Sequence, residues 1–192
     1  LDETMGGPGV RPYQPEGIWF AVGYSGSNTV RYAQGPVGDL HRRSLYTFWK
    51  RTAPPPNLTT FDAPMRDACT VRRERTNTPL QALVMLNDPT YVEAARFIAA
   101  RVLREAGPSD RERADHLFQL VVSRAPTSGE SDRITALVRS LTADFEATPS
   151  DAVELVAIGD LEVPVDADTI ELAAWTLTAS AILNLDEVLT RN

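Results

Sequence analysis

Residues 78–89 read TPLQALVMLNDP, and this stretch marks where the helical part of the chain begins. Thr78 is a favourable N-cap residue, Pro79 suits the first helical position, and Gln81 has the spacing that completes a capping box. Asn87-Asp88-Pro89 then breaks this helix and caps the next one. The stretch therefore predicts two consecutive helices with a short turn between them.

The same capping pattern recurs twice downstream. Ser109 and Glu112 have the spacing of a second capping box, and each such box should precede a helix. Thr127 and Glu130 have the spacing of a third. Apolar residues at helical spacing follow both. We therefore expect helices from residue 89 to a stop at Gly107, from Ser109, from Thr127, over residues 151–158, and over residues 168–183.

These signals predict a mainly α fold, a compact antiparallel bundle of about five helices over residues 77–192. Residues 1–76 are instead rich in Gly and Pro, and then in arginine and aromatic residues. We expect them to form a largely irregular arm that packs on the bundle through anchors such as Trp19. Because Leu1 is not a methionine start, we interpret both parts as one structural domain cut from a longer protein.

Three short segments of the arm carry their own local predictions. Residues 30–32 (VRY) have the composition of a short strand. Residues 44–49 (SLYTFW) fit either a strand, because of their aromatic residues, or one face of a helix. Residues 54–56 (PPP) should adopt polyproline II.

Composition excludes several classes of site. The net charge of −7 argues against a nucleic-acid-binding protein, and no apolar stretch approaches the roughly 20 residues of a membrane helix. Cys69 is the only cysteine, which excludes an internal disulfide, a c-type haem site and a multi-cysteine zinc site in this chain. His41 and His116 lie far apart, without further ligands at metal-binding spacing. We therefore expect no cofactor and no metal here.

Charge is spread unevenly along the chain. Residues 42–75 contain eight basic and three acidic residues, whereas residues 144–171 contain nine acidic residues and no basic one. Either these two regions pair with each other, or they mark different faces of the protein.

The strongest candidate for ligand binding is the arginine cluster that precedes Thr78. Guanidinium groups beside a helix N-terminus favour an anion, such as an acidic sugar, a sulfate, a phosphate or a carboxylate. The alternative is internal ion pairing to Asp62, Asp67 or the acidic C-terminal region. The candidate anion-binding residues are Arg42, Arg43, Arg72, Arg73 and Arg75.

Aromatic residues of the same region suggest a second kind of site. Tyr46 and Trp49 are candidates for an aromatic platform under a sugar ring, and the alternative is that they anchor the proline-rich arm. No catalytic residue is predicted, because the chain has no GxSxG sequence and Cys69 has no histidine placed beside it by a motif.

Several long and unusual stretches of this chain resemble the family called domain of unknown function 1553. The resemblance covers nearly the whole chain and is weakest between residues 144 and 168. It rests on residues 42–49 (RRSLYTFW), 61–64 (FDAP), 76–83 (TNTPLQAL), 86–89 (LNDP) and 183–191 (LNLDEVLTR).

That resemblance implies a setting that composition does not show. Domains of this family are typical of planctomycetes and related bacteria, and they form the C-terminal end of large exported proteins, behind another domain of unknown function and often a cytochrome c-like module. The implied location is the periplasm or the cell surface, and the implied partners are the upstream domains of the same polypeptide. Genomic association with polysaccharide breakdown adds an anionic polysaccharide as a candidate ligand. The family has no established catalytic residues to carry over.

Two functions are consistent with these observations. The first is a non-catalytic interaction or scaffold module of a cell-envelope protein. The second is part of an enzyme acting on polysaccharide, with an active site shared with the upstream domain. Arginines that converge on an open cleft would favour ligand binding, whereas arginines engaged in internal contacts would favour the scaffold.

Overall fold

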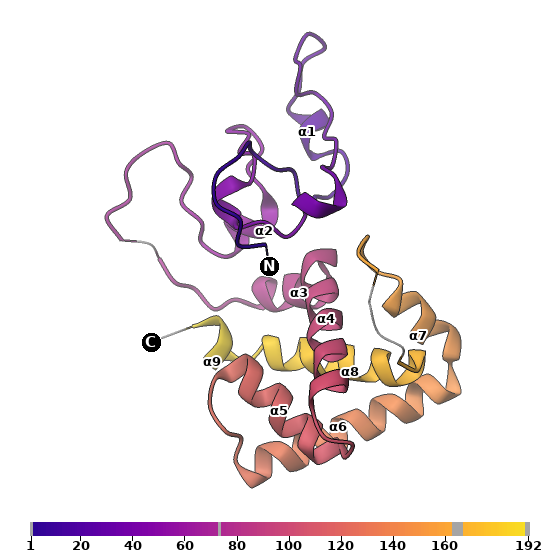
Figure 1. Cartoon of the computed structure of the whole chain (residues 1–192). Helices are drawn as coiled ribbons and strands as arrows, with labels where there is room; N and C mark the ends of the chain where they lie inside the picture. Colours follow the sequence, from indigo (N-terminus) through magenta and orange to yellow (C-terminus); the bar gives the residue numbers. More distant parts are fainter. Residues whose placement is uncertain (1, 73, 163–166, 191–192) are drawn as a thin grey trace. The chain divides into compact units, whose positions relative to one another are not determined.

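The structure is a computed structural model that describes residues 2–72, 74–162 and 167–190. Over these residues the regular structure is helical, with isolated β-bridges and no strand (Figure 1). No helix in these ranges is long and apolar enough to cross a membrane. The chain divides into two compact units, Leu1–Gln81 and Ala82–Asn192, and the division falls inside helix α3 (Pro79–Asn87). Each unit is described by itself.

The second unit contains the predicted helices, and their N-terminal caps form as expected. Ser109 accepts a hydrogen bond from the backbone N–H of Glu112, and the Glu112 carboxylate accepts one from that of Ser109. Thr127 and Glu130 form the same reciprocal pair. The mainly α prediction is thus confirmed. The helices are α4 (Pro89–Glu105), α5 (Asp110–Val122), α6 (Ser128–Ala147), α7 (Pro149–Val156), α8 (Thr169–Leu183) and α9 (Asp186–Leu189).

Helix α8 forms the centre of this unit. It packs against α4, α6 and α7, and Figure 1 shows it lying across α4. Buried residues occupy all sides of α8, as expected for a helix surrounded by others. Its buried Thr176 and Thr178 hydroxyls donate to the carbonyl oxygens four residues earlier, at 2.7 and 2.8 Å, so the polar groups are satisfied inside the helix. Ala95 and Ala99 of α4 are fully buried and allow the helices to approach closely.

A buried ion pair in α4 holds the segment that follows α7. Glu93 and Arg96 lie one turn apart, both are buried, and their side chains approach to 3.3 Å. Arg96 donates to the carbonyl oxygens of Val156 and Leu161, the latter at 2.5 Å, while Glu93 accepts from the Leu161 backbone N–H at 2.7 Å. The two charged side chains therefore satisfy the backbone of a turn some 60 positions further along the chain.

Glycine is required at the tip of this turn. Gly159 has φ of +93°, in the left-handed region, and a Cβ atom there would overlap the Glu93 carboxylate. The turn and the buried carboxylate are therefore fitted to each other.

The first unit builds its own small core from short helical turns and irregular segments. Trp19 is almost fully buried, its ring 4.9 Å from that of Tyr32 and 5.5 Å from that of Phe48. Val10 and Leu40 are also buried. The short elements are α1 (Ile18–Ala21), the 3-10 turns η1 (Val37–Asp39) and η2 (Ser44–Tyr46), and α2 (Pro56–Thr60).

Two local predictions for this unit were wrong, and one alternative is resolved. Residues 30–32 do not form a strand: Val30 and Arg31 form a bend, because the backbone N–H of Val30 bonds to the carbonyl oxygen of Ser27 in a turn. The polyproline stretch is cut short, because Pro56 takes the first position of α2, which tolerates its missing N–H. Residues 44–49 are neither strand nor helix face throughout: they begin as the η2 turn and then form an isolated bridge from Thr47 to Val10.

We expect Arg96→Ala to destabilise the protein by about 3–5 kcal/mol, because the substitution leaves the buried Glu93 carboxylate uncompensated. Urea unfolding followed by circular dichroism measures this. The matched control is Arg101→Ala on the same helix, whose half-exposed side chain pairs with Glu105 and which should cost no more than about 1 kcal/mol. Equal losses in the two variants would contradict the structural role of the buried pair.

Candidate functional site

Arg42, a predicted anion-binding residue, is engaged inside the first unit. Its side chain is 8% exposed and lies 3.7 Å from the Asp2 carboxylate. One terminal nitrogen donates to the carbonyl oxygens of Thr4 and Gly6, both at 2.7 Å. The guanidinium also stacks 4.3 Å from the centroid of the Tyr46 ring. Arg42 thus fastens the N-terminal segment to η2 and presents little of its charge to a ligand.

Arg43 and Tyr46 contact the same N-terminal segment. Arg43 donates to the sulfur of Met5 at 3.3 Å, and the Tyr46 hydroxyl accepts from the backbone N–H of Gly6 at 2.8 Å. The structure therefore brings Arg42, Arg43 and Tyr46 together, as a clasp on residues 2–6.

Trp49, the other predicted platform residue, lies under a different cation. The guanidinium of Arg66 is 4.8 Å from the centroid of its ring, so this contact occupies one face of the indole. The buried Trp19 ring also contacts cations: the Lys50 ammonium lies 4.9 Å and the Arg11 guanidinium 5.7 Å from its centroid. Sequence reasoning missed Arg11, Lys50 and Arg66 as partners, because nothing in their spacing shows which ring each cation reaches.

The remaining predicted arginines belong to a separate loop, residues 64–77, whose described residues are all exposed. Arg72 and Arg75 lie there, and Arg73 lies outside the described residues. The loop is tied at its base, where Asp62 accepts from the Thr76 backbone N–H at 2.8 Å. Asp67, a predicted internal partner, pairs at 2.9 Å with Arg51 instead.

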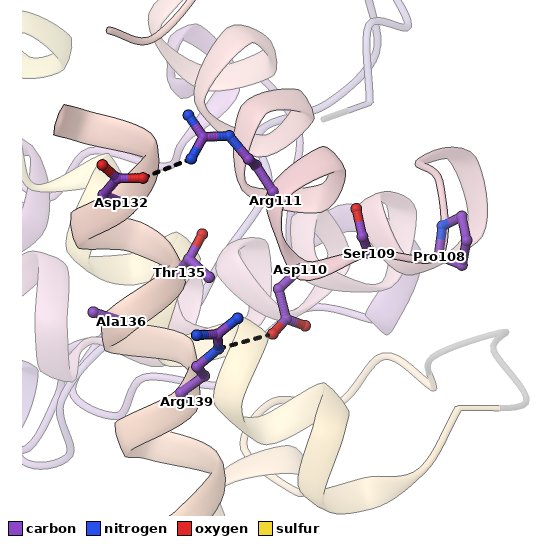
Figure 2. Close-up of a pocket in the computed structure, with 8 residues that line it drawn as sticks. All are labelled: Pro108, Ser109, Asp110, Arg111, Asp132, Thr135, Ala136 and Arg139. Atoms are coloured by element: carbon purple, nitrogen blue, oxygen red, sulfur yellow. Dashed lines mark hydrogen bonds and ion pairs between the residues drawn. The ribbon is translucent and has the colours of Figure 1, made fainter. Parts of the chain in front are cut away.

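Figure 2 shows an open cleft in the second unit, between α5 and α6, with a volume of about 650 Å³. Two ion pairs cross it: Arg111 with Asp132 at 2.6 Å, and Arg139 with Asp110 at 3.5 Å. Sequence reasoning did not select these residues, because alternating charges on exposed helix faces are common. The cleft is lined by Pro108, Ser109, Asp110, Arg111, Asp132, Thr135, Ala136 and Arg139.

A third charged cluster joins three helices at Arg124, just after α5. Its guanidinium makes two bonds to the Glu130 carboxylate, at 2.7 and 3.0 Å, and two to Glu187 of α9, both at 2.8 Å. Hydrogen bonds from Arg124, followed by those from Thr127, lower the pKa of Glu130 to about 2. Arg124 also lowers the pKa of Glu187, and both carboxylates raise the pKa of Arg124. This exposed cluster fastens α9 and has the geometry of a structural tie.

Comparison with known families identifies the family of this chain. A family model described as "Protein of unknown function (DUF1553)" matches residues 1–138. The chain belongs to this family. The match spans all of the first unit and continues in the second unit to about the middle of α6. Residues 183–191, which are part of the resemblance seen in the sequence, lie beyond the matched residues. No curated protein and no solved structure matches the chain.

Acid should loosen the cluster at Arg124 in a defined pH range. Because the folded pKa of Glu130 is depressed from 4.5 to about 2, its contribution to stability is fully present above pH 4.5 and is lost as the pH falls towards 2. We expect Glu130→Gln to flatten the pH dependence of the unfolding midpoint in this range, measured by thermal denaturation. The control is Asp132→Asn, two residues further along α6, where the carboxylate pairs with Arg111 instead. An unchanged profile for Glu130→Gln would contradict the role of the cluster.

Proposed function

We propose that this chain is a non-catalytic interaction module of a large exported bacterial protein, and that it docks onto upstream parts of the same polypeptide. The proposal is supported by the internal use of Arg42 and Arg43, which the scaffold interpretation requires. It is carried by an exposed apolar row on α3, which resembles the anchor spacing of helices that bind in grooves.

The row consists of Leu80, Leu83 and Leu86, which are 60%, 58% and 48% exposed. They recur every three residues on one side of α3, whereas Gln81 and Met85 on the other side are buried. Exposed leucines on one face of a helix form an apolar patch, and such patches mark interaction sites. Burying three leucine side chains would contribute several kcal/mol at about 1.5–3 kcal/mol for each fully buried residue.

The test is binding between this chain and the separately produced upstream part of the same natural polypeptide, measured by isothermal titration calorimetry. We expect Leu83→Asp to weaken that binding at least about tenfold, because it places a charge in the centre of the apolar row. Val153→Asp is the matched control, since Val153 of α7 is equally exposed, at 59%. The proposal fails if the two parts do not bind, or if both substitutions have the same effect.

A second candidate function is recognition of an anionic ligand, and the exposed position of Arg72 on the loop of residues 64–77 favours it. A ligand that binds only the folded state raises the unfolding midpoint further as its concentration increases. We expect sulfate or a sulfated oligosaccharide to raise the midpoint of the native chain and to lose this effect in Arg72→Ala. Arg31→Ala, an exposed arginine outside the loop, is the control. Retention of the shift in Arg72→Ala excludes this loop as the anion site.

A further inference from the structure

A second hollow of about 340 Å³ lies at the N-terminus of α8. It adjoins the cleft between α5 and α6, because Asp110 and Arg139 line both, and the two hollows together are called the groove below. The second hollow differs from the first in chemistry, because acidic side chains surround an apolar floor.

Carboxylates dominate the rim of the second hollow. Asp110, Glu146, Asp168 and Glu171 line it, whereas Arg139 is the basic residue among its lining side chains. Glu171 is already paired with Arg113 at 2.5 Å. Glu146 is exposed and has no ion pair within the described part of the chain. The rim therefore has negative charge in excess of the cations that neutralise it.

The N-termini of α5 and α8 lie at the groove, but their backbone N–H groups are not available to bind an anionic ligand. The side chain of Asp168 accepts the backbone N–H of Glu171 at 3.0 Å and so caps α8. Ser109 and Glu112 cap α5 in the same way. Because the chain's own carboxylates and hydroxyl already use these donors, an added anion would meet the acidic rim without a free N-terminus to offset it.

The floor of the hollow suits the hydrocarbon stem of a basic side chain. Val138 and Trp175 are buried beneath it, and Ile170 is partly buried beside them. Arginine and lysine characteristically lay their methylene groups along apolar surface while the charged end meets carboxylates. Arg139 shows how weakly the present cation is held, since it is 73% exposed and lies 3.5 Å from Asp110.

We propose that this groove docks an extended, arginine- or lysine-bearing segment of a protein partner, with one basic side chain over Trp175 and its charge against Glu146 and Asp110. The charge complementarity of rim and ligand selects this occupant over an acidic peptide or a polyanion. The proposal deepens the proposed function by naming a partner chemistry, but it uses a surface distinct from the leucine row of α3.

The probe is a fluorescein-labelled peptide TVRRERTN, a basic sequence that the chain itself contains at residues 70–77, and binding is measured by fluorescence anisotropy. We expect Glu146→Lys to weaken binding about tenfold more than Glu154→Lys, which makes the same charge change on an exposed site of α7. Glu146 lies in the last turn of α6, where a lysine favours the helix, so the variant should fold. Circular dichroism checks this.

Equal weakening by the two substitutions would show that only net charge attracts the peptide and would overturn the proposal, as would equal binding of the peptide TVQQEQTN. Leu83→Asp should leave peptide binding unchanged. If the peptide does not bind at the groove but Leu83→Asp still weakens docking of the upstream part, only the proposal for the groove is rejected. If docking fails and the peptide still binds, only the proposal for the α3 surface is rejected.

Discussion

The arrangement of the second unit depends on one buried interaction, the ion pair of Glu93 and Arg96. Both side chains leave water, so the pair persists only because each also bonds to backbone groups that would otherwise be unsatisfied. Those groups belong to the last residue of α7, Val156, and to the turn that follows it. The pair therefore holds the end of α7 to α4. Because α8 packs against both of these helices, a shift of α7 relative to α4 would disturb the packing around α8. Gly159 completes the constraint, since no other residue leaves room for the carboxylate.

Interactions that are local in sequence could be predicted, and distant ones could not. The three capping boxes involve residues three positions apart, so their residue types alone specify them. Arg96 binds carbonyl oxygens about 60 residues away, and any residue supplies a carbonyl, so no partner could be read from the sequence. One signal was available: Arg96 falls on the same helical stripe as Val92 and Ala99, which are buried. A charged residue inside an apolar stripe indicates a buried, paired charge.

In the candidate site, too, the sequence did not show which groups the functional side chains contact. Dense arginines and aromatic residues predicted a surface for an anion or a sugar, but neither signal distinguishes a ligand from the chain itself. Arg42 uses the carbonyls of Thr4 and Gly6 together with the Tyr46 ring. The irregular first unit has few helical hydrogen bonds, so stacked cations and side-chain-to-backbone bonds provide its order. An arginine-rich segment with little secondary structure is therefore expected to engage its arginines in hydrogen bonds and stacking contacts within the chain.

The two units differ in their balance of basic and acidic residues. Residues 1–81 contain ten basic and seven acidic residues, whereas residues 82–192 contain nine and nineteen. In the second unit, ion pairs such as those of Arg111, Arg113 and Arg124 engage much of the available positive charge. The surplus is therefore acidic, and much of it comes from residues 144–171, which contain nine acidic residues and no basic one. Glu146, Asp168 and Glu171 of this segment line the groove. Uncompensated surface charge of one sign opposes the compact state unless a partner neutralises it. The charge distribution thus favours the cationic segment proposed above, rather than an anion, as a ligand of the second unit.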